Sequence, residues 1–216
     1  WLKAAVIGSI WAAVEIIAGS FLHNLRVPFA GTLLAASSVF LLTAFMRRWK
    51  EPYIILRAGI ICALMKSVSP SAVILGPMAG IFAEALILEF TALLLGRNIF
   101  AFMAGGALAV LWPLLQKVLN WLILYGFDLV KILESLYDFL VMKTGAAAPE
   151  PWVLISAIVL LYMLVGALSA LGGLRAASGV IRSKSGRAAF PKSDFERKTF
   201  FKASGKQNYS LWMLSL

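Results

Sequence analysis

The chain has 216 residues, of which 61% are hydrophobic and 14% are charged, and its formal net charge is +10. Soluble globular domains carry about 25% charged residues, so this chain has too few charges to cover a water-soluble surface. Its basic residues lie in short stretches between apolar blocks and in the segment after Leu174. This distribution is typical of a membrane protein and argues against nucleic-acid binding, which so basic a chain would otherwise suggest.

Six apolar blocks follow one another along the first 174 residues. A transmembrane helix needs about 20 mostly apolar residues. By this criterion the predicted spans cover approximately residues 4–22, 29–45, 52–65, 72–96, 99–124 and 152–174. The third is short, and the fifth contains Pro113. We therefore predict an all-α membrane protein with a bundle of six transmembrane helices over residues 1–174.

The basic residues predict the orientation of the bundle. If every block spans, one end carries Lys3, Arg47, Arg48, Lys50, Arg97, Arg175, Arg182, Lys184 and Arg187, and the other carries Arg26, Lys66, Lys131 and Lys143. The richer end is expected to be cytoplasmic. An even number of spans then places both termini in the cytoplasm.

Two segments lie outside the predicted spans. Residues 127–142 place four leucines on one helical face and Asp128, Lys131, Ser135 and Asp138 on the other. This pattern predicts an amphipathic helix on the outer surface or over the mouth of the bundle. Residues 175–216 form a predicted basic cytoplasmic tail, held on anionic lipid or on a partner subunit.

The first span carries small residues at a regular spacing. Ala4, Gly8 and Ala12 are four residues apart, so they share one helix face. Small side chains let a second helix approach closely. The stripe predicts either docking to a separate subunit or ordinary packing inside the bundle.

Two acidic residues fall inside predicted spans. Glu15 lies twelve residues from Lys3, and Glu84 lies twelve residues before Gly96, so both are expected about 18 Å from the basic end. A charge at that depth is costly unless it faces a cavity or a partner. We predict a binding or proton site at one or both; the alternative is a carboxyl group that only holds helices together.

A further charged pair is expected to be structural. Arg57 lies near the start of the third span and Glu89 near the end of the fourth. Antiparallel neighbours would bring them to matched depth, about 10 Å into the membrane. We predict that they form an ion pair in which each neutralises the other.

Polar residues collect at the outer ends of the spans, together with a Gly-Pro-x-x-Gly run at residues 76–80. Irregular backbone at membrane depth is tolerated where it lines a cavity. We therefore predict an outward-facing pocket, although His23 taken alone is also explained as a surface histidine. The predicted substrate-binding residues are Glu15, His23, Asn24, Lys66, Glu84, Lys117, Asn120 and Trp121.

Several catalytic signatures are missing from the sequence. It contains no G-x-x-x-x-G-K-[ST] loop for ATP hydrolysis and no H-E-x-x-H zinc motif. Its single cysteine, Cys62, and single histidine form no metal cluster and no disulfide. We predict a protein that is not an enzyme and that needs neither a cofactor nor a metal.

Six short spans, a small-residue stripe on the first and a Gly-Pro-x-x-Gly run on a later one resemble the S components of energy-coupling factor (ECF) transporters. The resemblance covers residues 1–174. It implies a bacterial cytoplasmic (inner) membrane protein that captures a vitamin-like solute or precursor from outside. It further implies that Ala4, Gly8 and Ala12 dock to a transmembrane coupling protein, which carries two ATPases. The chain lacks the N-terminal histidine of the metal-specific members, and segments 127–142 and 175–216 depart from the family pattern.

Two functions from different classes follow from these patterns. The first is a solute-binding transporter subunit, embedded in membrane lipid and driven by an external motor. The second is a non-catalytic structural or assembly subunit of a larger membrane complex. Copurifying partners would separate them, because the first predicts an ATPase pair and a coupling protein.

Overall fold

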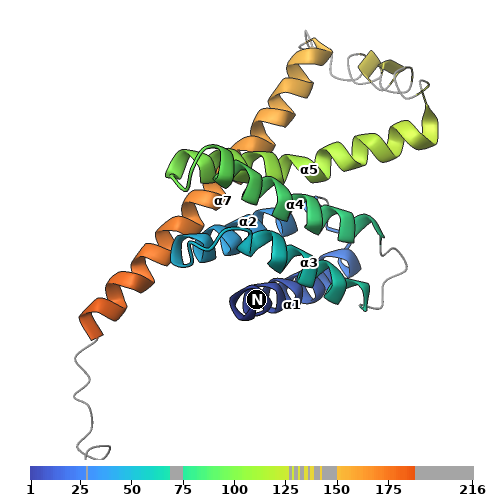
Figure 1. The fold of residues 1–216 in the computed structure, drawn as a ribbon. Helices are drawn as coiled ribbons and strands as arrows, with labels where there is room; N and C mark the ends of the chain where they lie inside the picture. Colours follow the sequence, from blue (N-terminus) through green and yellow to red (C-terminus); the bar gives the residue numbers. More distant parts are fainter. Residues whose placement is uncertain are drawn as a thin grey trace, which may run out of the picture. The chain divides into compact units, whose positions relative to one another are not determined.

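The computed structural model describes residues 1–27, 29–68, 75–126 and 150–187, with isolated positions between 128 and 142. These ranges fold into six helices: α1 (Leu2–Asn24), α2 (Ala30–Arg48), α3 (Ile54–Ser67), α4 (Leu75–Leu94), α5 (Ile99–Tyr125) and α7 (Pro151–Arg187) (Figure 1). The predicted all-α fold is thus confirmed over the described residues. Most of the predicted amphipathic segment 127–142 and the end of the predicted tail, residues 188–216, lie outside them.

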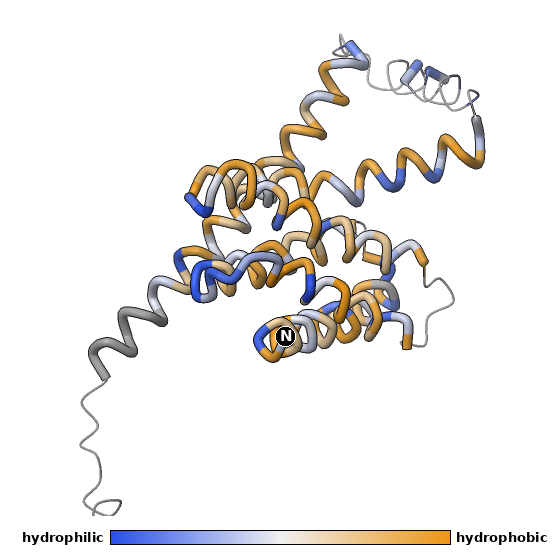
Figure 2. The backbone as a smooth tube through the Cα atoms, in the orientation of Figure 1, coloured by the Kyte–Doolittle hydropathy of each residue, from blue (hydrophilic) through white to orange (hydrophobic). Residues whose placement is uncertain are grey.

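Five of the described helices are long and apolar enough to cross a membrane, namely α1, α2, α4, α5 and α7. Hydrophobic residues run along most of each helix (Figure 2), and many large apolar side chains, such as Ile17 and Phe90, are exposed on the outside. An outer face of this kind suits lipid. Helix α3 differs because its 14 residues are only about 21 Å long, against a hydrocarbon core of about 30 Å. The structure therefore supports five of the six predicted spans by length and composition.

The residues up to Ser178 form one compact unit. Within it α3 lies between α1 and α4, and α5 packs against α4 and α2. Trp11, Ile55, Leu42 and Leu88 are among the side chains that are buried where these helices meet. The core therefore sits among α1 to α5, where the polar side chains described below are also found, and α7 adds Tyr162, Ala170 and Leu174 to it.

The small-residue stripe of α1 is the surface on which α1 packs against α3. Ala4 and Ala12 are fully buried. A Cβ atom added to Gly8 would lie 2.7 Å from the backbone oxygen of Ala58 in α3. These observations support the alternative predicted from the sequence, packing inside the bundle, while docking of the stripe to another subunit stays a prediction.

Helix α7 approaches the bundle through glycines. A Cβ atom added to Gly106 of α5 would lie 2.7 Å from the backbone oxygen of Gly166 in α7. Gly173 comes similarly close to the backbone of Phe40 in α2. On α7, Gly166, Ala170 and Gly173 thus repeat at the three- to four-residue spacing that permits close crossings between membrane helices.

The first part of α7 and the last part of α5 are much less covered. Residues 151–158 of α7 and 117–126 of α5 are exposed on all sides. In Figure 1 the end of α5 runs away from α1 and α3. The packed bundle thus covers only one half of each of these two helices.

Candidate functional site

A hydrogen-bonded chain links α1 to α2 in the core. Trp11 and Glu15 lie one turn apart on α1, so both face the same neighbour. The indole Nε1 of Trp11 donates to the hydroxyl Oγ of Ser38 on α2 over 2.7 Å. That hydroxyl lies 2.9 Å from both Oε1 of Glu15 and the backbone oxygen of Leu34. Since a serine hydroxyl has one hydrogen, it donates to one of these acceptors at a time.

Lys66 reaches the same place from α3. Its Nζ atom donates to the backbone oxygen of Glu15 over 3.1 Å, and its charge acts on the Glu15 carboxyl group. Lys66, one of the predicted substrate-binding residues, is therefore buried beside Glu15 and not exposed at an outer end of the bundle. Its long side chain turns inward along apolar surface and places its positive charge beside an acid.

Glu84 brings a second carboxyl group from α4. Like Glu15, it is only 5% exposed, and its carboxyl group lies close enough to Glu15 to be affected by the charge of that acid. The two acids are therefore neighbours, as their matched depth in the sequence indicates. We call Glu15 and Glu84 the carboxyl pair.

One oxygen of the carboxyl pair is left without a partner. Among the described residues only two buried side-chain atoms lack a hydrogen bond, Oε2 of Glu84 and Nε1 of Trp112. Buried polar atoms are nearly always paired, and an ionised carboxylate can only accept. With two acids and one lysine, the fully ionised group carries one excess negative charge. The charge and the unpartnered oxygen can therefore be complemented by one further proton, one cation, or one N–H or O–H donor.

The other residues expected at the pocket mouth do not join the pair. Asn24, Lys117 and Asn120 are exposed, and so is half of Trp121. The last three lie on the part of α5 that leaves the bundle (Figure 1). The side chain of His23 and the predicted roof over residues 127–142 fall outside what the structure describes. Of the predicted substrate-binding set, the structure brings together Glu15, Lys66 and Glu84.

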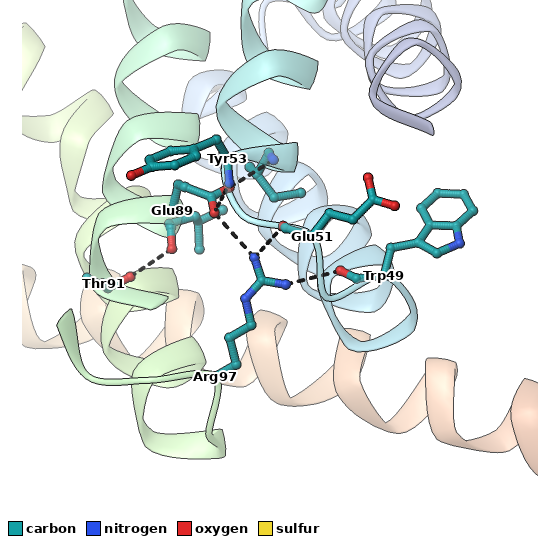
Figure 3. A network of polar contacts seen from close by, with 8 residues as sticks. Trp49, Glu51, Tyr53, Glu89, Thr91 and Arg97 are labelled. Atoms are coloured by element: carbon teal, nitrogen blue, oxygen red, sulfur yellow. Dashed lines mark hydrogen bonds and ion pairs between the residues drawn. The ribbon is translucent and has the colours of Figure 1, made fainter. Parts of the chain in front are cut away.

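A third buried acid, Glu89, has a complete set of partners (Figure 3). Its Oε1 accepts from the backbone nitrogen of Tyr53 over 2.8 Å, and its Oε2 accepts from that of Ile55 over 2.9 Å. These amides belong to the first turn of α3, where free N–H groups favour a negative charge. Arg97 lies 3.3 Å from Oε1 and supplies the counter-charge.

The predicted ion pair between Arg57 and Glu89 is therefore wrong. Arg97 takes that place, and the Arg57 guanidinium lies over the ring of Trp1, 5.3 Å from its centroid. Depth along a helix was the basis of the prediction, and depth does not fix the direction in which a side chain points. Arg97, in the short connection after α4, reaches the carboxylate from the membrane surface.

Arg97 also holds the connection between α2 and α3. Its guanidinium donates to the backbone oxygens of Trp49 over 3.2 Å and Glu51 over 2.6 Å. The Glu51 side chain is paired with Lys3 at the start of α1. These contacts gather one end of the bundle, which we call the basic end: Lys3, Arg47, Arg48, Lys50 and Arg97.

The sequence contained signals for some of the residues that were missed. Trp11 precedes Glu15 by four residues, a spacing that places an indole N–H beside an intramembrane acid. Gly166, Ala170 and Gly173 repeat the small-residue spacing on the last span. Ser38 had no such signal, because serine is common in membrane helices.

The comparisons with known proteins add no relative to these observations. No cluster of three or more His, Cys, Asp or Glu side chains suited to a metal occurs in the described part of the chain. No protein-family model matches the chain, and no curated protein and no solved structure shows significant similarity to it.

Proposed function

We propose that this chain is a substrate-binding membrane subunit of a transporter, which captures a small solute at the carboxyl pair. The observation that carries the proposal is the buried, unpartnered Oε2 of Glu84. Acids at membrane depth are costly and are retained where they serve a site. Because Glu89 on the same helix is fully satisfied, the open acceptor at Glu84 is specific to this position.

The chemistry of the site favours one class of solute. A carboxylate oxygen without a donor is complemented by a cation or by an N–H or O–H group. Lys66 adds one positive charge beside the two acids, so a further single positive charge or a neutral hydrogen-bond donor would complement the pair. A small amine-bearing or hydrogen-bonding solute fits this requirement better than an anion.

The proposal includes an external motor and a location. The chain lacks a P-loop, so ATP-driven transport requires separate ATPases and a coupling protein, as in the ECF family that the sequence resembles. Docking would use an outer face of the bundle, since Gly8 packs against α3 and Ala4 and Ala12 are buried. The proposal puts the basic end and both termini in the cytoplasm of a cell with a bacterial inner membrane, and the positive-inside distribution of charge supports this orientation.

The test is a search for a small molecule bound to the full-length protein extracted from membranes. Native mass spectrometry compares the unmodified chain with Glu84→Gln, and with Glu51→Gln as a control at an exposed acid. We expect a bound small molecule in the unmodified chain and in the control, and at least tenfold less in Glu84→Gln, because a charge-assisted hydrogen bond is lost. Equal occupancy in all three, or no bound molecule in any, contradicts the proposal.

A second function is supported by a different observation. The exposed apolar parts of α5 and α7 offer helix faces that another membrane protein could cover, as in a structural or assembly subunit. Copurification from mild detergent distinguishes the two. An ATPase pair supports the transporter, and a stable set of other membrane proteins that is unaffected by Glu84→Gln supports the assembly subunit.

A further inference from the structure

The basic end contains a small hollow. It has a volume of about 270 Å³ and is lined by Met46, Arg47, Lys50, Arg97 and Phe102. We call it the basic hollow. At about 30 Å³ for each water molecule, it has room for about nine of them. That volume accommodates a phosphodiester with a small headgroup.

The rigid wall of the basic hollow is Arg97. Its side chain is bonded to Glu89 and to the backbone oxygens of Trp49 and Glu51. These bonds fix the segment that carries Lys50, and they use the Arg97 charge within the protein. Arg97 therefore shapes the hollow without leaving an excess positive charge there.

Arg47 and Lys50 supply the excess charge. Both are exposed, and no acidic partner for either is found among the described residues. The two acids of the described basic end are already paired, Glu51 with Lys3 and Glu89 with Arg97. The hollow is therefore lined by two uncompensated cations.

The position of the hollow indicates what fills it. Leu94, Leu95 and Phe100, in the adjoining end of α4 and start of α5, are more than half exposed. The hollow thus lies where the apolar surface of the bundle gives way to charged side chains. In a membrane, this is the level of the lipid headgroups.

We infer that the basic hollow binds the phosphate of an anionic phospholipid, with Arg47 and Lys50 as its ligands. Arg47 donates to phosphate oxygens through a planar fork, and Lys50 acts as a point charge. Met46 and Phe102 provide apolar contacts for the glycerol end of the lipid. Two cations favour a lipid of net negative charge over a zwitterionic lipid, whose own ammonium group would be repelled.

The test measures which lipids remain bound to the full-length protein. The protein is reconstituted in vesicles of phosphatidylglycerol and phosphatidylcholine, extracted in mild detergent and examined by native mass spectrometry. Arg47→Gln and Lys50→Gln each remove one proposed ligand. Arg48→Gln is the matched control, because Arg48 is the neighbouring exposed arginine of α2 and does not line the hollow.

We expect retained phosphatidylglycerol to fall about tenfold in Arg47→Gln and in Lys50→Gln, the effect of one lost charge-assisted hydrogen bond. Arg48→Gln should change it by less than about fivefold, the general effect of one surface charge. Phosphatidylcholine should be little affected. Unfolding midpoints in detergent should be the same in all variants, since the three side chains are exposed.

Two results would overturn the inference. If Arg48→Gln lowers lipid retention as much as Arg47→Gln, the attraction is a diffuse surface potential and the hollow is no site. If inorganic phosphate binds the delipidated protein through Arg47 and Lys50 while lipid retention is equal in all variants, the ligand is a soluble phosphate. Neither result depends on whether the carboxyl pair binds a solute.

Discussion

Glu84 and Glu89 lie on the same helix and are almost equally buried, yet their surroundings differ. Glu89 accepts from two backbone amides of α3 and faces Arg97. Glu84 faces Glu15, and its Oε2 lacks a partner. The comparison teaches that burial alone does not give an intramembrane acid a role. An acid whose bonds are complete holds the helices together, whereas one with an open acceptor is available for a ligand.

The largest effect expected from this comparison is the loss of stability in Glu89→Gln. The substitution keeps the shape of the side chain but leaves Arg97 without its counter-charge and turns an amide toward the first turn of α3. Breaking one side of a buried ion pair costs about 3–5 kcal/mol. Denaturant unfolding in detergent measures the loss of unfolding free energy. A loss below about 1 kcal/mol would contradict the view that Glu89 is the structural acid of the two.

The next effect concerns the hydroxyl beside the carboxyl pair. Ser38→Ala removes the acceptor for Trp11 and the donor for Glu15, both of which stay buried. Leaving buried polar groups unpaired costs about 1–3 kcal/mol. The same unfolding measurement applies, with Ser156→Ala as a control, because Ser156 is exposed and donates to the backbone within its own helix. If Ser38→Ala and Ser156→Ala lower the free energy of unfolding equally, the Trp11–Ser38–Glu15 hydrogen bonds make no special contribution to stability.

Glu84→Gln is expected to change stability by less than about 1 kcal/mol, since it breaks no bond at Oε2 and removes one of two neighbouring acids. The direction should be toward higher stability in the absence of solute. This result contrasts directly with Glu89→Gln and is read in the same experiment. A destabilisation as large as that of Glu89→Gln would make Glu84 a structural residue.

The smallest effect is expected at the exposed pair of Lys3 and Glu51. The hydrogen bond and charge of Lys3 lower the pKa of the Glu51 carboxyl group below its ordinary value. Because the pKa of Glu51 is lower in the folded chain than in the unfolded chain, the ion pair stabilises the folded state at any pH above the pKa of the unfolded chain. This stabilisation is lost as the pH falls through the lowered pKa of the folded chain. The difference in stability between the unmodified chain and Glu51→Gln should be slight near neutral pH and should vanish in acid, once the pH is below the lowered pKa of Glu51. A difference that persists in acid would not arise from this charge.

Much of the fold could be predicted from the sequence. The apolar blocks predict where the helices lie, and the positions of the basic residues predict which ends of the helices lie together. The depth count also put Glu15 and Glu84 at one level, since residues of two antiparallel helices that are equally far from the same end of the bundle lie at the same depth. The depth count does not give the direction in which a side chain points around its helix. For this reason it paired Glu89 with Arg57, whereas the structure pairs Glu89 with Arg97. The spacing of the small residues on α1 likewise predicted that another helix packs closely against Gly8. It did not indicate that this helix is α3.

The brevity of α3 affects how the protein meets its bilayer. The side chains of Ile60, Leu64 and Met65 on this helix are exposed, so lipid contacts a helix about 9 Å shorter than an average hydrocarbon core. If α3 is the sixth span that the sequence predicts, the bilayer would have to thin at this sector, at a cost of a fraction of a kcal/mol for each ångström of mismatch. Shorter acyl chains remove that deformation. Membrane thickness would then favour thin bilayers for this protein and would link the packing around α3, including Lys66 beside the carboxyl pair, to lipid chain length.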